Sequence, residues 1–279
     1  EERLSVADAI AKHNAAVVSP LEVSLLTAGE RGGRLESACE HLAQYFDLRY
    51  KSSSKAMGAL VYPMILLHMG LVVPELPGLV ASDDVGKAAL GLLLRLGVMW
   101  MVMGALAFLG WRAVQSAVHN ASVDRFLRLI PLVGATRRHW AMARFCQVFH
   151  TGLLAALNMS ETLKLAGDAS QSAILSEASS RAAKKIEQGS TLAGSLQSTD
   201  ALAKSFYNAV DTAEQTGTLD KEMDRWAKVE AEMAARAQDR VAEWLPRVFY
   251  VAVLIYVASR IIGVVSGYYG QVNQMLESM

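Results

Sequence analysis

The sequence is poor in cysteine, with only Cys39 and Cys146 among 279 residues. Two cysteines are too few for a disulfide framework, and their spacing does not fit a metal-binding pair. We therefore expect two reduced thiols, both buried. The six histidines are scattered and form no H-E-x-x-H motif, which excludes a zinc site of that type. The sequence predicts no metal and no cofactor.

An excess of charge of either sign is also absent, because 27 basic residues balance 27 acidic ones. A nucleic-acid partner would require a basic face, so none is expected. The sequence has no G-x-x-x-x-G-K-[ST] motif and hence no ATP site of that type. Any energy that the protein uses must then come from another protein, and we do not expect an enzyme.

Apolar residues make up 52% of the chain and gather in three blocks, at about 56–73, 88–111 and 245–270. A helix that crosses the hydrocarbon layer needs about 20 apolar residues, and the second and third blocks reach that length. The first block is shorter and contains Pro63, so a buried core helix is the main alternative there.

Flanking charges predict the orientation, because basic residues stay on the cytoplasmic side. Arginines and lysines precede the first block and follow the second, whereas the loop between them is acidic. The predicted order is a truncated N-terminal cytoplasmic helical repeat (1–55), a first transmembrane helix (56–76), a periplasmic loop (77–87), a second transmembrane helix (88–112), a second cytoplasmic helical-bundle repeat (113–244), a third transmembrane helix (245–270) and a periplasmic tail (271–279).

The segment between His139 and Trp244 has helical periodicity and predicts five or six helices, hence an all-α fold. Gly189 is placed where a helix should stop, and Ser160 and Ser190 where helices could start.

Part of this bundle has a counterpart near the N-terminus. Residues 25–46 align with residues 209–230, and in both copies the matched segment opens a long helix that leads into an apolar block. The first copy is short, since it lacks residues corresponding to about 140–185 of the second. The matched pairs are Glu30 with Glu214, Gly33 with Gly217, Leu35 with Leu219, Glu36 with Asp220, and Ala43 with Ala227.

The repeated motif predicts a helix break. Gly33 and Gly217 can adopt positive φ and end one helix, and the leucine two residues later begins the next. Glu30 and Glu214 then fall in the last turn of the first helix, where the helix dipole disfavours a carboxylate. Either the free N–H groups of the next helix or a basic group on a partner protein could compensate, and the sequence leaves both open.

These residues resemble the type II secretion system F protein family, which includes the inner-membrane platform proteins of type IV pili. The resemblance is carried by Gly29, Glu30, Gly33 and Leu35, by Glu214, Gly217 and Leu219, and by the Tyr62–Pro63 pair. Weaker matches are Leu153–Leu154, Ala156–Leu157, Gly189–Ser190, Leu192 and Leu196. The chain departs from the family in its abbreviated first domain, in Ala213, where the family often has glycine, and in Arg260.

The resemblance implies two cytoplasmic six-helix domains and three spans in a bacterial inner membrane. It implies a platform that couples a cytoplasmic hexameric ATPase to the assembly of pilin or pseudopilin subunits, alongside other inner-membrane platform components. A platform on an axis is expected to be a homo-oligomer. Secretion, pilus and DNA-uptake machines share this component, so the sequence does not separate them.

Among the polar residues inside the predicted spans, Arg95, His68 and Arg260 require an interpretation. Arg95 is expected to extend toward the nearby membrane surface, and His68 to be a neutral, satisfied group. Arg260 lies deep in the third span, beside a stripe of small residues at Ser259, Gly263 and Gly267 that favours close helix packing. We expect Arg260 either to extend outward or to contribute to a groove that contacts a subunit.

Two other classes of function stay possible on sequence alone. A small membrane transporter conflicts with three spans and a large soluble part, because transporters usually bind their substrate among many helices. An intramembrane serine protease could use Ser266, in the sequence Gly263-Val-Val-Ser-Gly267, with His68 as the base. That motif is one residue longer than G-x-S-G, and helix packing explains the same glycines.

Overall fold

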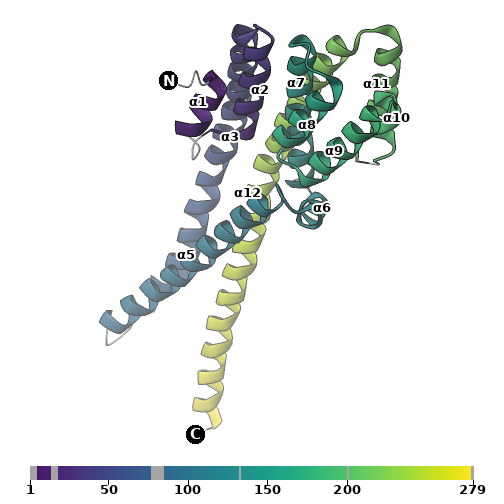
Figure 1. The fold of residues 1–279 in the computed structure, drawn as a ribbon. Coiled ribbons are helices and arrows are strands. Elements are labelled where there is room, and N and C mark those ends of the chain that lie inside the picture. The colour runs from purple at the N-terminus through teal and green to yellow at the C-terminus, as the bar shows by residue number, and fades with distance from the viewer. Residues whose placement is uncertain (1–4, 14–17, 77–84, 132, 200, 278–279) are drawn as a thin grey trace. The chain divides into compact units, whose positions relative to one another are not determined.

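The computed structural model describes residues 5–13, 18–76, 85–131, 133–199 and 201–277, and within them it contains helices and no strand (Figure 1). The chain divides into two compact units. Unit 1 consists of residues 1–53 and 111–238, and unit 2 of residues 54–110 and 239–279. An all-α fold is therefore confirmed for the described residues.

Unit 1 is a helical bundle. Its helices are α1 (Val6–His13), α2 (Pro20–Arg31), the first part of α3 (Leu35–Val72), the end of α5 (Val85–Ser116), α6 (Ala121–Leu129), α7 (Val133–Leu154), α8 (Met159–Ala169), α9 (Ala173–Glu187), α10 (Leu192–Gln197), α11 (Lys204–Thr216) and the first part of α12 (Leu219–Glu277). Six of these, α7 to α12, cover the region in which the sequence predicted five or six.

Side-chain caps start most of the shorter helices of unit 1. Ser19 and Glu22 form a capping box at α2, and Ser172 caps α9. Asn158 caps α8 and Thr191 caps α10. The prediction that Ser160 and Ser190 start these helices is wrong by two residues and by one residue, respectively. The side chains of Asn158 and Thr191 accept the hydrogen bonds from the first free N–H groups instead.

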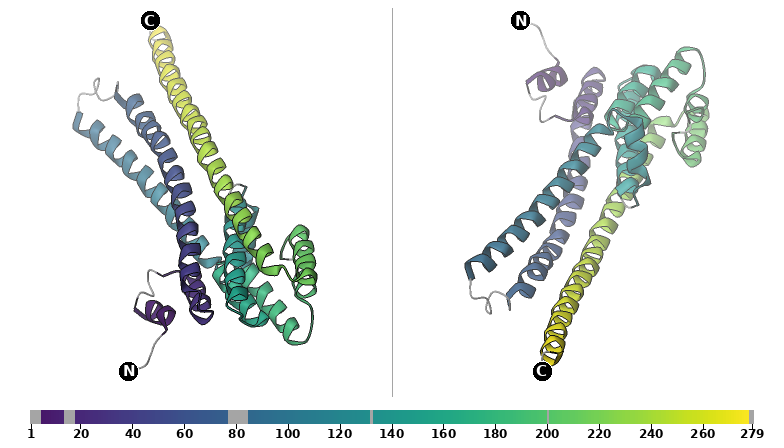
Figure 2. Two further views of the ribbon diagram at one scale, coloured as in Figure 1. Left: turned by 90° about the horizontal axis from the view of Figure 1, so that it is seen from above. Right: turned by 90° about the horizontal axis from the view of Figure 1, so that it is seen from below.

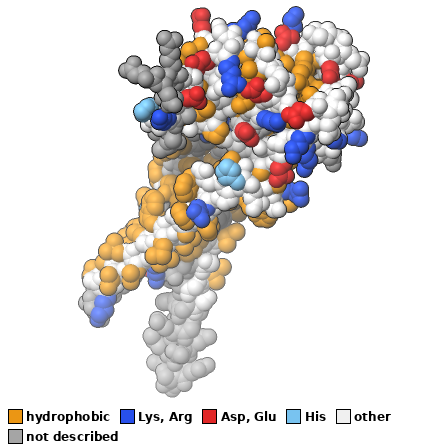
Figure 3. All heavy atoms as spheres, in the orientation of Figure 1, with side chains coloured by type: hydrophobic (Ala, Val, Ile, Leu, Met, Phe, Trp, Pro, Cys, Tyr) orange, Lys and Arg blue, Asp and Glu red, His pale blue; other side chains and the backbone are white. Residues whose placement is uncertain are grey.

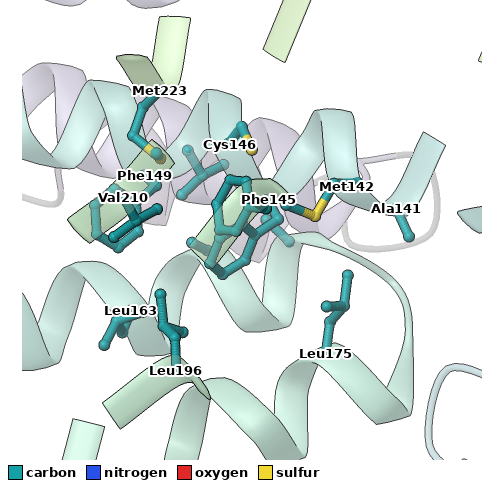
Figure 4. Packing of buried hydrophobic residues seen from close by; sticks show 14 of the residues in the cluster. Ala141, Met142, Phe145, Cys146, Phe149, Leu163, Leu175, Leu196, Val210 and Met223 are labelled. Carbon is teal, nitrogen blue, oxygen red and sulfur yellow. The ribbon is translucent and has the colours of Figure 1, made fainter. Parts of the chain in front are cut away.

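The core of unit 1 is built around α7. Phe145, Phe149 and Val148 of α7 are fully buried and meet apolar residues from α8 to α12 (Figure 4). Leu21 and Leu25 of α2 belong to the same cluster, and α2 packs against α7 and α8. The first repeat therefore shares one hydrophobic core with the second instead of forming a core of its own.

Unit 2 contains three helices that are long and apolar enough to cross a membrane. They are parts of α3, α5 and α12, and a short 3-10 helix, η1 (Val73–Glu75), follows α3. Almost none of their apolar surface is buried within the protein. In the space-filling view, hydrophobic side chains gather along α5 with few charges between them (Figure 3). Unburied apolar helices of this length are typical of membrane spans.

Two of these helices are long and unbroken. α3 has 38 residues and α12 has 59, and both continue past a proline (Figure 2). Pro63 lies 28 residues after Leu35, and Pro246 lies 27 residues after Leu219. Pro63 therefore lies inside a continuous helix.

Candidate functional site

The two copies of the repeat correspond helix by helix. α1, α2 and the start of α3 match α10, α11 and the start of α12 in order. The helices α7 to α9 have no counterpart among the described N-terminal residues, as the short first copy in the sequence predicted. The matched turns, between α2 and α3 and between α11 and α12, form the candidate site.

The Glu214 carboxylate contacts the N-terminus of a neighbouring helix. Its two oxygens accept hydrogen bonds from the backbone N–H groups of Leu192, at 2.8 Å, and Ala193, at 3.0 Å. Leu192 and Ala193 are the first two residues of α10. The carboxylate therefore satisfies N–H groups that have no partner inside their own helix and adds a negative charge at the positive end of its dipole.

Glu30 makes the same interaction in the first copy. Its oxygens accept hydrogen bonds from the N–H groups of Val6, at 3.0 Å, and Ala7, at 3.3 Å, which begin α1. The structure thus gives both glutamates an internal partner. The N–H groups belong to the helix that precedes the glutamate's own helix, whereas the internal alternative considered in the sequence analysis placed them on the following helix.

Glycines terminate the two helices that carry the glutamates. Gly33 has φ +65° and Gly217 has φ +68°, and α3 and α12 begin two residues later at Leu35 and Leu219. The residue after each glycine donates its N–H five residues back, Arg34 to Gly29 at 2.7 Å and Thr218 to Ala213 at 2.9 Å. This is the Schellman pattern, which needs a left-handed residue and therefore favours glycine.

The difference between Gly29 and Ala213 follows from packing. A Cβ atom at Gly29 would lie 2.6 Å from the Cβ of Ala38, so the first copy has no room for a side chain. Ala213 is buried in the second copy and has that room. The departure from glycine at Ala213 therefore leaves the turn intact.

A buried arginine joins the two repeats, and the sequence analysis missed it. The guanidinium of Arg144, on α7, donates to the Ser170 carbonyl at 2.6 and 3.1 Å and to the Tyr45 hydroxyl, on α3, at 3.2 Å. Burial lowers the pKa of Arg144 from its ordinary value. No local pattern distinguishes this arginine from its neighbours, since its partners are distant in the sequence.

A pair of histidines lies nearby between α3 and α7. The rings of His41 and His150 meet edge to face, with centroids 5.5 Å apart. They line a small pocket of about 160 Å³ together with Asp224 and Lys228 of α12. Burial, and then the neighbouring His150, lower the pKa of His41 below its ordinary value of 6.5.

Two polar residues of the predicted spans, Arg95 and His68, have partners within unit 2. Arg95 forms an ion pair with Glu75, so extension toward the membrane surface is not its only stabilisation. The Nδ1 atom of His68 is 2.7 Å from the Met64 carbonyl oxygen, so the ring has a hydrogen-bonding partner. A Cβ atom at Gly70 would lie 2.8 Å from Val253, which makes Gly70 the small residue that permits close approach of α3 and α12.

The predicted small-residue stripe has no such contact at Gly263, where an added Cβ would meet nothing within 4 Å. The side chain of Arg260 and the surroundings of Gly267 lie outside the described part of the chain. The Ser266 hydroxyl donates to the Ile262 carbonyl of its own helix at 2.8 Å. Neither Ser266 nor His68 has the other as a hydrogen-bonding partner in the described structure, which gives no support to a protease dyad.

The cysteines also differ from expectation. Cys146 is buried, but Cys39 is exposed, so the prediction of two buried thiols is wrong for Cys39. Cys39 lies on the side of α3 that faces away from the core. The sequence alone does not show which side of α3 faces the core. Burial raises the pKa of the Cys146 thiol well above its ordinary value.

Comparison with known proteins places these features in context. Residues 1–76 and 145–268 match the family model described as type II secretion system (T2SS), protein F. The type II secretion system protein F of Pseudomonas aeruginosa is 31% identical over 222 residues, which cover 73% of this chain and 55% of the relative.

A type IV pilus assembly protein, PilC of Thermus thermophilus, is 26% identical over 246 residues, covering 81% of this chain and 60% of the relative. TapC of Aeromonas hydrophila, another type IV pilus assembly protein, is 24% identical over 230 residues. The chain thus spans little more than half the length of these relatives. Both matched segments of the family model contain one copy of the glutamate–glycine turn.

Proposed function

Because the chain belongs to the type II secretion system protein F family, we propose that it acts as an inner-membrane platform protein of a type II secretion or type IV pilus-like machine. The three apolar helices support a multi-pass membrane protein. The basic residues around them support an orientation with unit 1 in the cytoplasm and the 77–87 loop in the periplasm. The role is assembly of other proteins and not catalysis.

The repeated turn is the observation that carries this proposal. In each copy, a glutamate binds the N-terminus of a short helix, and a glycine three residues later ends the glutamate's own helix. Two residues after that glycine, the long helix that runs into an apolar segment begins. The bundle and the span are therefore joined by a continuous helix, without a flexible linker. A push on unit 1 would pass into the membrane along α3 and α12.

The partners follow from this mechanical role. From membership of the family we infer that a cytoplasmic hexameric ATPase supplies the motion, and the sequence itself has no nucleotide-binding motif of the P-loop type. The spans would pass it to the membrane helix of a pilin or pseudopilin subunit. A homo-oligomer, together with other inner-membrane platform components, would hold the chain on the axis of the machine.

Co-purification from native membranes tests the proposal. Full-length protein extracted in mild detergent should carry an assembly ATPase and pilin-like proteins, identified by mass spectrometry. Deletion of the gene should abolish either extracellular secretion or surface pili, and the process that is lost identifies the machine. Intact secretion and piliation in the deletion strain would contradict the proposal.

The transporter alternative has its own test. Purified protein in liposomes should move no solute across the bilayer, because three spans provide few helices to enclose a substrate path. Solute uptake by the protein alone, abolished by substitutions in the spans, would favour transport over assembly.

A further inference from the structure

Helix α6 exposes large apolar side chains on the outside of unit 1. Phe126 is 65% exposed and Leu129 is 76% exposed, which is unusual in a bundle whose other large apolar residues are mostly buried. Ile130, which directly follows α6, and Val133, the first residue of α7, are also exposed. We define the α6 apolar face as Phe126, Leu129, Ile130 and Val133.

The opposite side of α6 is held firmly against the bundle. Leu127 is buried, and α6 packs on α7 and α9. The fully buried Asp124 carboxylate accepts a hydrogen bond from the Arg137 guanidinium at 2.9 Å and one from the Ser172 hydroxyl. Asn120 caps the first turn of α6. The apolar face is therefore presented by a fixed helix and does not result from a detached segment.

The exposed charged residues of α6 and of the segments that directly flank it in sequence are all basic. Asp124 is the only acidic residue between Val85 and Ser160, and it is buried and paired with Arg137. Between Arg112 and Ser160, the exposed arginines are Arg112, Arg125 and Arg138. A chain segment with exposed apolar residues and exposed arginines, and with no exposed acid of its own, suits an anionic lipid interface.

Continuity with a span places this surface close to the bilayer. α5 ends at Ser116 and α6 begins at Ala121, so only four residues separate them. The apolar part of α5 ends near Trp111 and Arg112, residue types that favour the membrane surface. Four linking residues reach at most about 14 Å when fully extended. The start of α6 is thus tied to the end of a helix that crosses the membrane.

We propose that α6 is an interfacial helix whose apolar face inserts among the lipid acyl chains, with Arg125 and Arg138 against anionic headgroups. The occupant of this surface is the bilayer into which α5 continues. The interaction fixes the side of unit 1 that faces the membrane. It depends on α5 as a span but not on the assembly role proposed above.

Spin labelling of the full chain in vesicles tests this proposal. The Cys39→Ser background removes the exposed thiol, while Cys146 is buried and stays unlabelled under native conditions. A label at Leu129→Cys should collide with oxygen and be protected from a water-soluble nickel chelate. Leu106→Cys, exposed on α5, is the lipid control, and Thr212→Cys, exposed on α11, is the water control.

Each alternative has a distinct outcome. Nickel accessibility at Leu129→Cys equal to that at Thr212→Cys would overturn the proposal. Protection from both oxygen and nickel would show burial against protein, either a second copy or a partner, and would overturn it as well. Nickel accessibility at the Leu106→Cys control would overturn the proposal together with the assignment of α5 as a span.

Lipid composition tests the charge component. In vesicles of phosphatidylcholine with added phosphatidylglycerol, the label at Leu129→Cys should lie deeper than in phosphatidylcholine alone. The Arg125→Glu substitution should abolish that increase in depth, whereas Lys221→Glu, on exposed α12 surface remote in sequence, should preserve it. An increase in depth that survives Arg125→Glu and Arg138→Glu together would contradict the role of the arginines.

Discussion

At the scale of single residues, the two glutamates of the repeat have opposite effects on two helices. A carboxylate in the last turn of a helix is unfavourable for that helix, but each of these carboxylates lies at the N-terminus of another helix. The position that is unfavourable for the glutamate's own helix is therefore the one that brings its carboxylate to the N-terminus of the other helix. The contact at Glu214 is half-buried, whereas that at Glu30 is more exposed.

Removing the Glu214 carboxylate should destabilise unit 1. We expect Glu214→Ala to lower the free energy of unfolding by about 1–2 kcal/mol, as for loss of a helix cap. Glu214→Gln should lose less, because its amide oxygen can still accept one N–H. Glu30→Ala should lose less than Glu214→Ala, since water can replace the exposed carboxylate. Thermal unfolding in mild detergent measures all three, and equal losses for Ala and Gln would contradict this interpretation.

The left-handed glycines predict a second effect. Gly217→Ala should lower stability by about 1–2 kcal/mol, because a Cβ atom strains a residue with positive φ. Gly58→Ala is the matched control: Gly58 is helical, and an added Cβ meets nothing within 4 Å. The control should be neutral or stabilising. Thermal denaturation of both variants tests this, and a Gly217→Ala variant as stable as the control would show that the turn can shift.

At the scale of helices, the contact between α3 and α7 responds to pH. The pKa of His41 is lowered in the folded state, so the unfolded chain binds the proton more readily. Stability is therefore complete above about pH 6.5 and falls as the pH drops below that value, until the pH passes the lowered pKa of the folded state. His150, Asp224, Lys228 and Glu40 are the charged or titratable groups that modify this shift.

The His41→Gln substitution should reduce that acid sensitivity. The His41 carbonyl, which accepts a hydrogen bond from Gln147, is unaffected by the change of side chain. Unfolding midpoints measured between about pH 7.5 and about pH 5 should fall less in the variant than in the parent protein. His119→Gln, an exposed histidine, serves as the control and should leave the pH dependence unchanged. A parent-like slope in His41→Gln would assign the effect to another group.

At the scale of the whole molecule, the shared core of unit 1 makes the two repeats interdependent. Leu25 of the first repeat is fully buried in the cluster that α7 organises. Leu25→Ala should cost about 2–5 kcal/mol. It should also reduce the protection of α7 and α8 amides from hydrogen exchange, although both helices belong to the second repeat.

The control for this experiment is Tyr50→Ala, which truncates an exposed side chain on α3 and should leave α7 protection intact. Separate domains would confine the effect of Leu25→Ala to α1, α2 and α3. Exchange monitored by mass spectrometry resolves these elements.

The sequence predicts the parts of this fold that depend on local chemistry. Three apolar blocks, two glycine turns and the leucines that follow them are recognisable because each depends on a few neighbouring residues. The partners of Glu30 and Glu214, the burial of Arg144 against Tyr45, and the position of Cys39 are not recognisable in this way. They depend on which helices pack together, and that arrangement is set by contacts between residues far apart in the chain.

The two prolines of α3 and α12 have a mechanical consequence. A proline cannot donate the hydrogen bond that closes its helical turn, so the rod is most compliant at that point. Pro63 and Pro246 lie 28 and 27 residues from the turns that begin their helices, which is about 40 Å along each rod. Any bend at Pro63 or Pro246 would therefore fall at nearly the same distance from the turn that begins its helix.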